Sequence, residues 1–172
     1  MAAERSFTKT LSNNATEKEA VDLLLRTDPR FQKLDSSLKN ELLGLLGVAG
    51  RYTNRVFDLV MTPAPMAPLD LASLKRVATC VVLVETKATK KPIFDRELGG
   101  FFFGATENEY RISQELGNHY QFAFVVLNSN NAFGAPFFEL MGLDELERRT
   151  KTKRIQFQVN LKGKVPRLGR RA

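Results

Sequence analysis

The chain has 172 residues, of which 43% are hydrophobic, so it is long enough to bury a core and close to the usual size of one domain. Its single cysteine, Cys80, excludes an intramolecular disulfide framework and a multi-cysteine zinc site, and its single histidine, His119, excludes a two-histidine metal site. A formal net charge of +7 indicates a polyanionic partner.

The composition predicts an intracellular protein of a reducing compartment, and we expect it in the cytoplasm. No run reaches the roughly 20 apolar residues that a membrane span needs, and the first residues lack the apolar run of a secretory signal. We therefore expect no membrane partner. With so little cysteine and histidine, carboxylates are left as the expected catalytic groups.

Two helices are predicted near the N-terminus. A capping-box pattern that begins at Thr16 predicts a helix to about Leu25. Leucines at helical spacing predict a second helix from about Ser37 to Leu46. We interpret residues 1–50 as a helical layer of the same domain as the rest of the chain.

Two apolar runs then predict neighbouring strands, over residues 55–62 and 80–87, with a short helix near residues 70–77 between them. The second run changes abruptly from apolar residues to Glu85 and Lys87. Because side chains alternate across a strand, Glu85 and Lys87 point to the same face. Both can therefore belong to one site.

The later elements are predicted as a third strand over residues 101–103, a helix over 106–117, a strand over 119–127, a short helix over 143–149 and a last strand over 155–161. This order predicts an α/β (α+β) domain with a mixed central sheet flanked by helices.

Asp58, Glu85 and Lys87 are the predicted catalytic residues, and Asp58 and Glu85 are the predicted metal ligands. Pairing of the first two strands would bring Asp58 beside Glu85; Asp70 is the alternative upstream acid. Mg²⁺, or Mn²⁺ in its place, prefers hard oxygen ligands and keeps several waters, so one or two carboxylates can hold it against a phosphate. The ion would polarise the phosphoryl group, and Lys87 would orient or deprotonate the attacking water or stabilise the developing charge.

These residues resemble the acidic-x-lysine motif of the PD-(D/E)xK nuclease superfamily, through residues 84–87 and the upstream Asp58. Residues 85–89, 101–103 and 106–110 also resemble the restriction-endonuclease-like domain at the C-terminus of the plant NO VEIN protein and in bacterial proteins. The resemblance implies a restriction-endonuclease-like core, which we place at residues 51–147. It also implies nuclease activity, often in restriction or phage defence, and it maps Asn108 and Glu109 to a pair that opens the following helix.

The C-terminal residues 148–172 are predicted to form a basic strand and arm, because no acidic residue follows Glu147. Neutralising phosphates releases counterions, so such a segment suits sequence-independent contact with nucleic acid. The predicted contacts are Lys90, Lys91, Arg148, Arg149, Lys151, Lys153, Arg154, Lys162, Lys164, Arg167, Arg170 and Arg171. We expect DNA as the partner, with RNA left open, and a homodimer if both strands are cut.

Other side chains have structural interpretations beside the functional ones. Glu109 suits the third position of a capping box, His119 a strand edge, and residues 101–103 core packing rather than base stacking. Gln114 is expected at the surface, and Cys80 as a small buried residue.

The leading hypothesis is a metal-dependent endonuclease that hydrolyses DNA phosphodiester bonds. The alternative is a catalytically inactive nucleic-acid-binding module of a larger assembly, which retains the fold without effective catalysis. The structural interpretation of Glu85 and Lys87 is a solvated strand end with weakly paired charges. A third hypothesis is a protein-interaction domain whose charge serves solubility.

Overall fold

The computed structural model describes residues 2–95 and 97–150, with side chains from residue 15 onward. Its elements follow in the order α1 (Ala2–Thr27), β1 (Phe31–Gln32), α2 (Ser36–Leu45), β2 (Leu59–Met61), α3 (Leu71–Val77), β3 (Val82–Thr89), α4 (Glu107–Leu116), the 3-10 turn η1 (Gly117–His119), β4 (Tyr120–Val126), β5 (Phe137–Met141) and α5 (Leu143–Arg149). No helix among these residues is both long and apolar enough to cross a bilayer.

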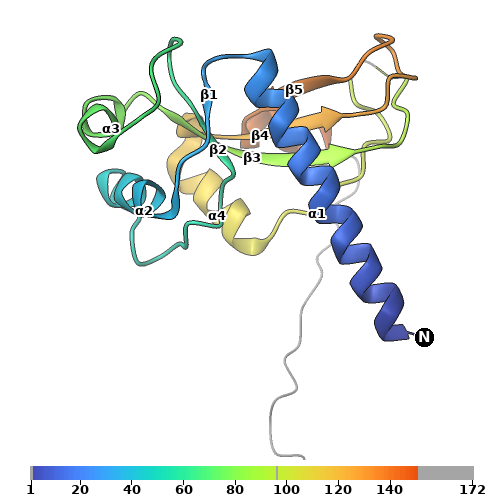
Figure 1. Cartoon of the computed structure of the whole chain (residues 1–172), viewed down its shortest axis with the longest axis horizontal. Coiled ribbons are helices and arrows are strands. Elements are labelled where there is room, and N and C mark those ends of the chain that lie inside the picture. The colour runs from blue at the N-terminus through green and yellow to red at the C-terminus, as the bar shows by residue number, and fades with distance from the viewer. Residues whose placement is uncertain (1, 96, 151–172) are drawn as a thin grey trace, which may run out of the picture.

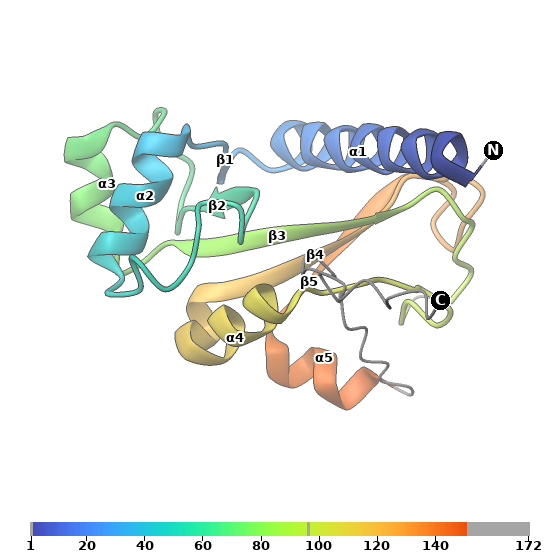
Figure 2. The same ribbon diagram turned by 90° about the horizontal axis from the view of Figure 1, so that it is seen from below.

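A five-stranded sheet in the order β1-β2-β3-β4-β5 forms the centre of the molecule (Figure 1). β3 and β4 are parallel, and the other neighbouring pairs are antiparallel. Helix α1 covers one face, α4 and α5 lie against the other, and α2 and α3 stand together at one end (Figure 2). The predicted α+β class, with a mixed central sheet flanked by helices, is therefore confirmed.

Helix α1 is longer than the sequence pattern predicted. It begins at Ala2 rather than near Thr16, so the expected capping box lies inside a helix that is already formed. Ala20, Val21 and Leu24 recur at helical spacing and are buried against the sheet. This stripe fixes which face of α1 turns inward.

The two helices at the end of the sheet agree with the prediction. Asp35 caps α2, accepting a hydrogen bond from the Leu38 backbone N–H at 2.9 Å. Asp70 caps α3 in the same way through Ser73. Cys80, expected to be buried, is exposed, because it lies in the turn between α3 and β3.

Strand β2 is much shorter than the predicted strand over residues 55–62, whereas β3 extends two residues beyond its predicted end. The antiparallel register begins at the pair Leu59 and Val84. Asp58 therefore precedes β2, and its backbone N–H donates to the Val84 carbonyl at 2.9 Å. Beyond Val84, the β2 side of β3 has no strand partner among the described residues.

Residues 101–103 do not form the predicted strand. The rings of Phe101 and Phe103 pack edge-on against Phe124 of β4, with ring centroids 5.3 and 4.9 Å away. The expectation of core packing holds for these two residues, but Phe102 is exposed. The segment has the composition of a strand, but no neighbouring strand among the described residues offers it backbone hydrogen bonds. Phe101 and Phe103 pack against the sheet instead.

Strands β1 and β5 were not predicted, and β5 adds an antiparallel edge beside β4. The predicted helix over residues 143–149 is present as α5. The predicted strand over residues 155–161 lies outside the described residues. His119 Nδ1 lies 3.1 Å from the Val81 carbonyl, which can only accept, so this histidine fastens the start of β4, as its structural interpretation expected.

Candidate functional site

Strand β3 carries Glu85 and Lys87 on the face that α4 covers. Glu85 is buried, and Lys87 is largely so. The Lys87 ammonium donates to Glu85 Oε1 at 2.8 Å. The expected alternative, a solvated strand end with weakly paired charges, is therefore wrong. That description applies to solvent-exposed pairs, whereas this pair is largely removed from solvent.

Glu109 joins this pair from the start of α4. Its backbone N–H donates to the Thr106 hydroxyl at 3.2 Å, and its Oε2 accepts from the Thr106 backbone N–H at 2.9 Å. The same oxygen accepts from the Lys87 ammonium at 2.8 Å. The predicted capping box is thus confirmed, and the capping side chain also contacts Lys87.

Asp58 reaches the site from the residue before β2. Its Oδ2 accepts from the Thr86 backbone N–H at 2.9 Å, on the side of β3 that β2 leaves uncovered. Its charge also raises the pKa of Glu85. Asp70, the alternative acid, is engaged by Ser73 at the start of α3, with an Oδ1 to backbone N–H distance of 2.7 Å. The structure thus brings Asp58, and not Asp70, to Glu85 and Lys87.

Glu17 of α1 is a fourth carboxylate near the site, and the sequence analysis missed it. Partial burial raises its pKa, as do Asp58 and Glu109, while Lys87 lowers it. A signal was available: Glu17 precedes the buried Ala20 by three positions and Leu24 by seven. Glu17 thus lies in line with the stripe by which α1 packs on the sheet, although its side chain is exposed.

Lys39 and Tyr120 hold the segment that leads to Asp58. The Lys39 ammonium donates to the Phe57 carbonyl at 2.5 Å and lies 4.5 Å from the centre of the Phe57 ring. The buried Tyr120 hydroxyl donates to the Val56 carbonyl at 2.5 Å. Two consecutive carbonyls before Asp58 are therefore fixed from α2 and β4, which orients the aspartate.

The electrostatics of the site are dominated by burial and by an excess of carboxylates. Burial raises the pKa of Glu85 to about 8, and Asp58 and Glu109 add to this against the opposing effect of Lys87. For Lys87, burial lowers the pKa, but Glu85 and Glu109 outweigh burial and leave it raised. Lys87 is thus a cation here, and it suits donation and charge stabilisation rather than proton abstraction.

The residues fit a hard divalent cation in charge and in donor type. Four carboxylates, Glu17, Asp58, Glu85 and Glu109, interact here with two lysines, Lys39 and Lys87, which leaves two negative charges uncompensated when all are ionised. Oxygen ligands of this kind are those that Mg²⁺ prefers, and it can be held by one or two of them. Among the described side chains, no group of three or more histidine, cysteine or acidic residues is placed so that it could hold a metal ion.

Several predicted nucleic-acid contacts form ion pairs within the described part of the chain. Lys90 pairs with Glu19 at 2.6 Å, and Arg149 with Glu139 at 3.0 Å. Arg148 pairs with Glu145, while Lys91 is exposed. Such surface pairs are weak and can exchange for phosphate. The remaining predicted contacts, Lys151, Lys153, Arg154, Lys162, Lys164, Arg167, Arg170 and Arg171, lie outside the described residues.

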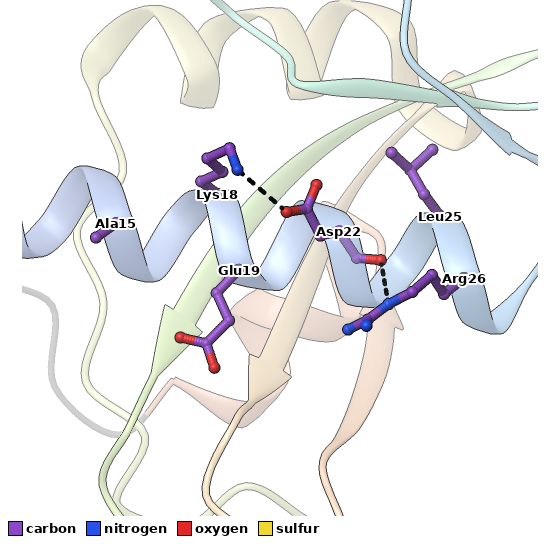
Figure 3. Close-up of a pocket in the computed structure, with 6 residues that line it drawn as sticks. All are labelled: Ala15, Lys18, Glu19, Asp22, Leu25 and Arg26. Carbon is purple, nitrogen blue, oxygen red and sulfur yellow. Dashed lines mark hydrogen bonds and ion pairs between the residues drawn. The ribbon is translucent and has the colours of Figure 1, made fainter.

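An open hollow of about 660 Å³ lies elsewhere, along α1 (Figure 3). Six α1 residues line it: Ala15, Lys18, Glu19, Asp22, Leu25 and Arg26. Its Lys18–Asp22 ion pair, at 3.5 Å, joins two mostly exposed side chains one helical turn apart. None of Asp58, Glu85, Lys87 and Glu109 lines this hollow.

Comparisons of the chain with protein-family models, with curated proteins and with solved structures found no match.

Proposed function

We propose that the chain is a metal-dependent endonuclease of the PD-(D/E)xK type, acting on DNA phosphodiester bonds. The observation that carries the proposal is that Asp58 bonds the Thr86 backbone N–H, between Glu85 and Lys87, while Lys87 bonds Glu85. The pKa of Glu85, raised by burial and then by the charges of Asp58 and Glu109, is consistent with the proposal, because a divalent cation would favour the ionised carboxylate.

In this proposal Asp58 and Glu85 hold Mg²⁺ or Mn²⁺, which supplies polarisation of the phosphoryl group and a more acidic bound water. Lys87 donates a hydrogen bond to the scissile phosphate or to the attacking water, and its charge stabilises the negative charge that develops there. Glu109 holds the Lys87 ammonium from the side of α4. The resemblance extends the proposal to a setting in restriction or phage defence. Cutting both strands would require two active sites, which a homodimer would supply.

Nicking of supercoiled plasmid by the purified chain tests the proposal. We expect nicking with Mg²⁺ or Mn²⁺ and none with chelator. Glu85→Gln and Lys87→Met should each reduce the rate by roughly 100-fold or more, the effect of removing a group that stabilises transition-state charge. Glu107→Gln and Lys75→Met are matched controls, because both side chains are exposed and paired at the surface. Equal nicking by Glu85→Gln and wild type would refute the assignment.

A second candidate is a catalytically inactive nucleic-acid-binding module. It is favoured by the contacts of Lys87, whose ammonium is bound by both Glu85 and Glu109, as in a purely structural ion-pair network. This candidate predicts retention of DNA that weakens steeply with salt, with no metal-dependent nicking. The same plasmid assay therefore separates the two functions.

A further inference from the structure

Phe102 is held out into solvent by its neighbours. Phe101 and Phe103 are anchored on Phe124 of β4, with ring centroids 5.3 and 4.9 Å away. Between them, Phe102 is 82% exposed. An exposed phenyl ring loses the hydrophobic stabilisation that burial would give, and here its backbone is fastened on both sides. The ring is therefore presented in a defined place.

That place adjoins the candidate site. Phe124, on which the anchors pack, is the register partner of Lys87 across β3 and β4. A few residues further on, the Thr106 backbone N–H donates to Glu109 Oε2, the oxygen that also binds the Lys87 ammonium. The segment that carries Phe102 is thus attached at both ends to residues beside Lys87.

Two other exposed phenylalanines lie in the loops that follow β3 and β4. Phe94 is 65% exposed and Phe133 is 50% exposed. Their loops are joined, since the Ala132 backbone N–H donates to the Ile93 carbonyl at 3.1 Å. Lys91, which is exposed, precedes Phe94 by three positions. All the large exposed aromatic side chains of the described residues thus belong to loops that follow the two parallel strands, and one of these loops also carries the exposed Lys91.

We propose that these three phenylalanines, the aromatic surface, bind unpaired nucleobases, so that the preferred substrate is single-stranded DNA or DNA with an unpaired segment. Bases inside a duplex already stack on each other and offer no free face to a phenyl ring, whereas every unpaired base does. Exposed rings and a lysine in the same loop suit a stacked base with a neighbouring phosphate. The inference rests on the nucleic-acid part of the proposed function and names its substrate class.

The test measures fluorescence anisotropy with a labelled oligothymidylate, single-stranded or annealed to oligoadenylate, at low salt in chelator. We expect tighter binding of the single strand. Phe102→Ala should weaken single-strand binding at least about fivefold, the lower end of what stacking one base contributes, and leave duplex binding nearly unchanged. Leu71→Ala is the matched control, because Leu71 is 46% exposed but lies on α3, away from this surface.

Equal binding of single strand and duplex would overturn the inference, as would a Phe102→Ala variant that binds the single strand like wild type. Absence of any binding would also overturn it and would leave the surface to a protein partner. Because chelator removes cleavage from the measurement, a single-strand preference without plasmid nicking refutes only the endonuclease, and nicking without that preference refutes only the aromatic surface.

Discussion

At the scale of single residues, the candidate site depends on Lys87, whose ammonium is shared by Glu85 and Glu109. The sequence predicted that Glu85 and Lys87 share a face, because strand alternation is a local rule. It could not show Lys39 or Tyr120 behind Asp58, since those contacts join residues far apart along the chain. The helical spacing of Glu17 from Ala20 and Leu24 could have indicated its position on α1, but the sequence analysis did not use it.

The buried hydroxyl of Tyr120 gives a prediction on stability. Tyr120→Phe should lower the free energy of unfolding by about 1 to 3 kcal/mol, because the Val56 carbonyl would lose its buried donor. Chemical denaturation of the two proteins measures the difference. Tyr52→Phe is the control, since its hydroxyl bonds Glu115 at an exposed position and should cost less. A difference no larger than that of the control would contradict the prediction.

At the scale of elements, the sequence predicted α2, α3, α4, α5, β3 and β4 because each follows its own periodicity or cap. It failed where tertiary pairing decides. β5 exists because it pairs with β4, and β2 is short because the chain bends at Val56 and Asp58 before the pairing with β3 begins. Residues 101–103 have the composition of a strand but no strand to pair with.

Asp58 and Asp70, the two candidates for the upstream metal ligand, lie in different elements, and their substitutions should have different effects. Asp70→Ala removes the cap of α3 and should lower stability by about 0.5 to 2 kcal/mol without reducing the nicking rate. Asp58→Asn should abolish nicking instead. Thermal unfolding and the plasmid assay, run on both variants, check the pair of outcomes. Loss of nicking in Asp70→Ala, at a temperature where that variant remains folded, would contradict the assignment of Asp58 as the upstream metal ligand and favour Asp70.

At the scale of the whole molecule, buried charge couples stability to pH. The pKa of Glu85 is raised to about 8 in the folded state, whereas its ordinary value is 4.5. Between these values the folded protein keeps a proton that the unfolded chain releases, so stability falls as pH rises through this range. Below it both states are protonated, and the contribution of Glu85 is fully present.

Glu85→Gln should remove this dependence. In chelator, the stability of the variant relative to wild type should increase between pH 5 and pH 8, by up to about 1.4 kcal/mol for each pH unit. Unfolding midpoints across the pH range measure the effect. Glu107→Gln, at an exposed position on α4, should follow wild type throughout. Parallel curves for Glu85→Gln and wild type would contradict the assigned proton.

The bond from Thr86 to Asp58 has a consequence for self-association. β3 continues past the end of β2, and an uncovered strand invites the addition of a strand from another copy of the chain. The Asp58 carboxylate already accepts the hydrogen bond from the Thr86 backbone N–H there, and its charge disfavours pairing with an added strand. Asparagine at position 58 would retain an acceptor for this amide, whereas alanine would leave a bare main-chain donor and promote aggregation.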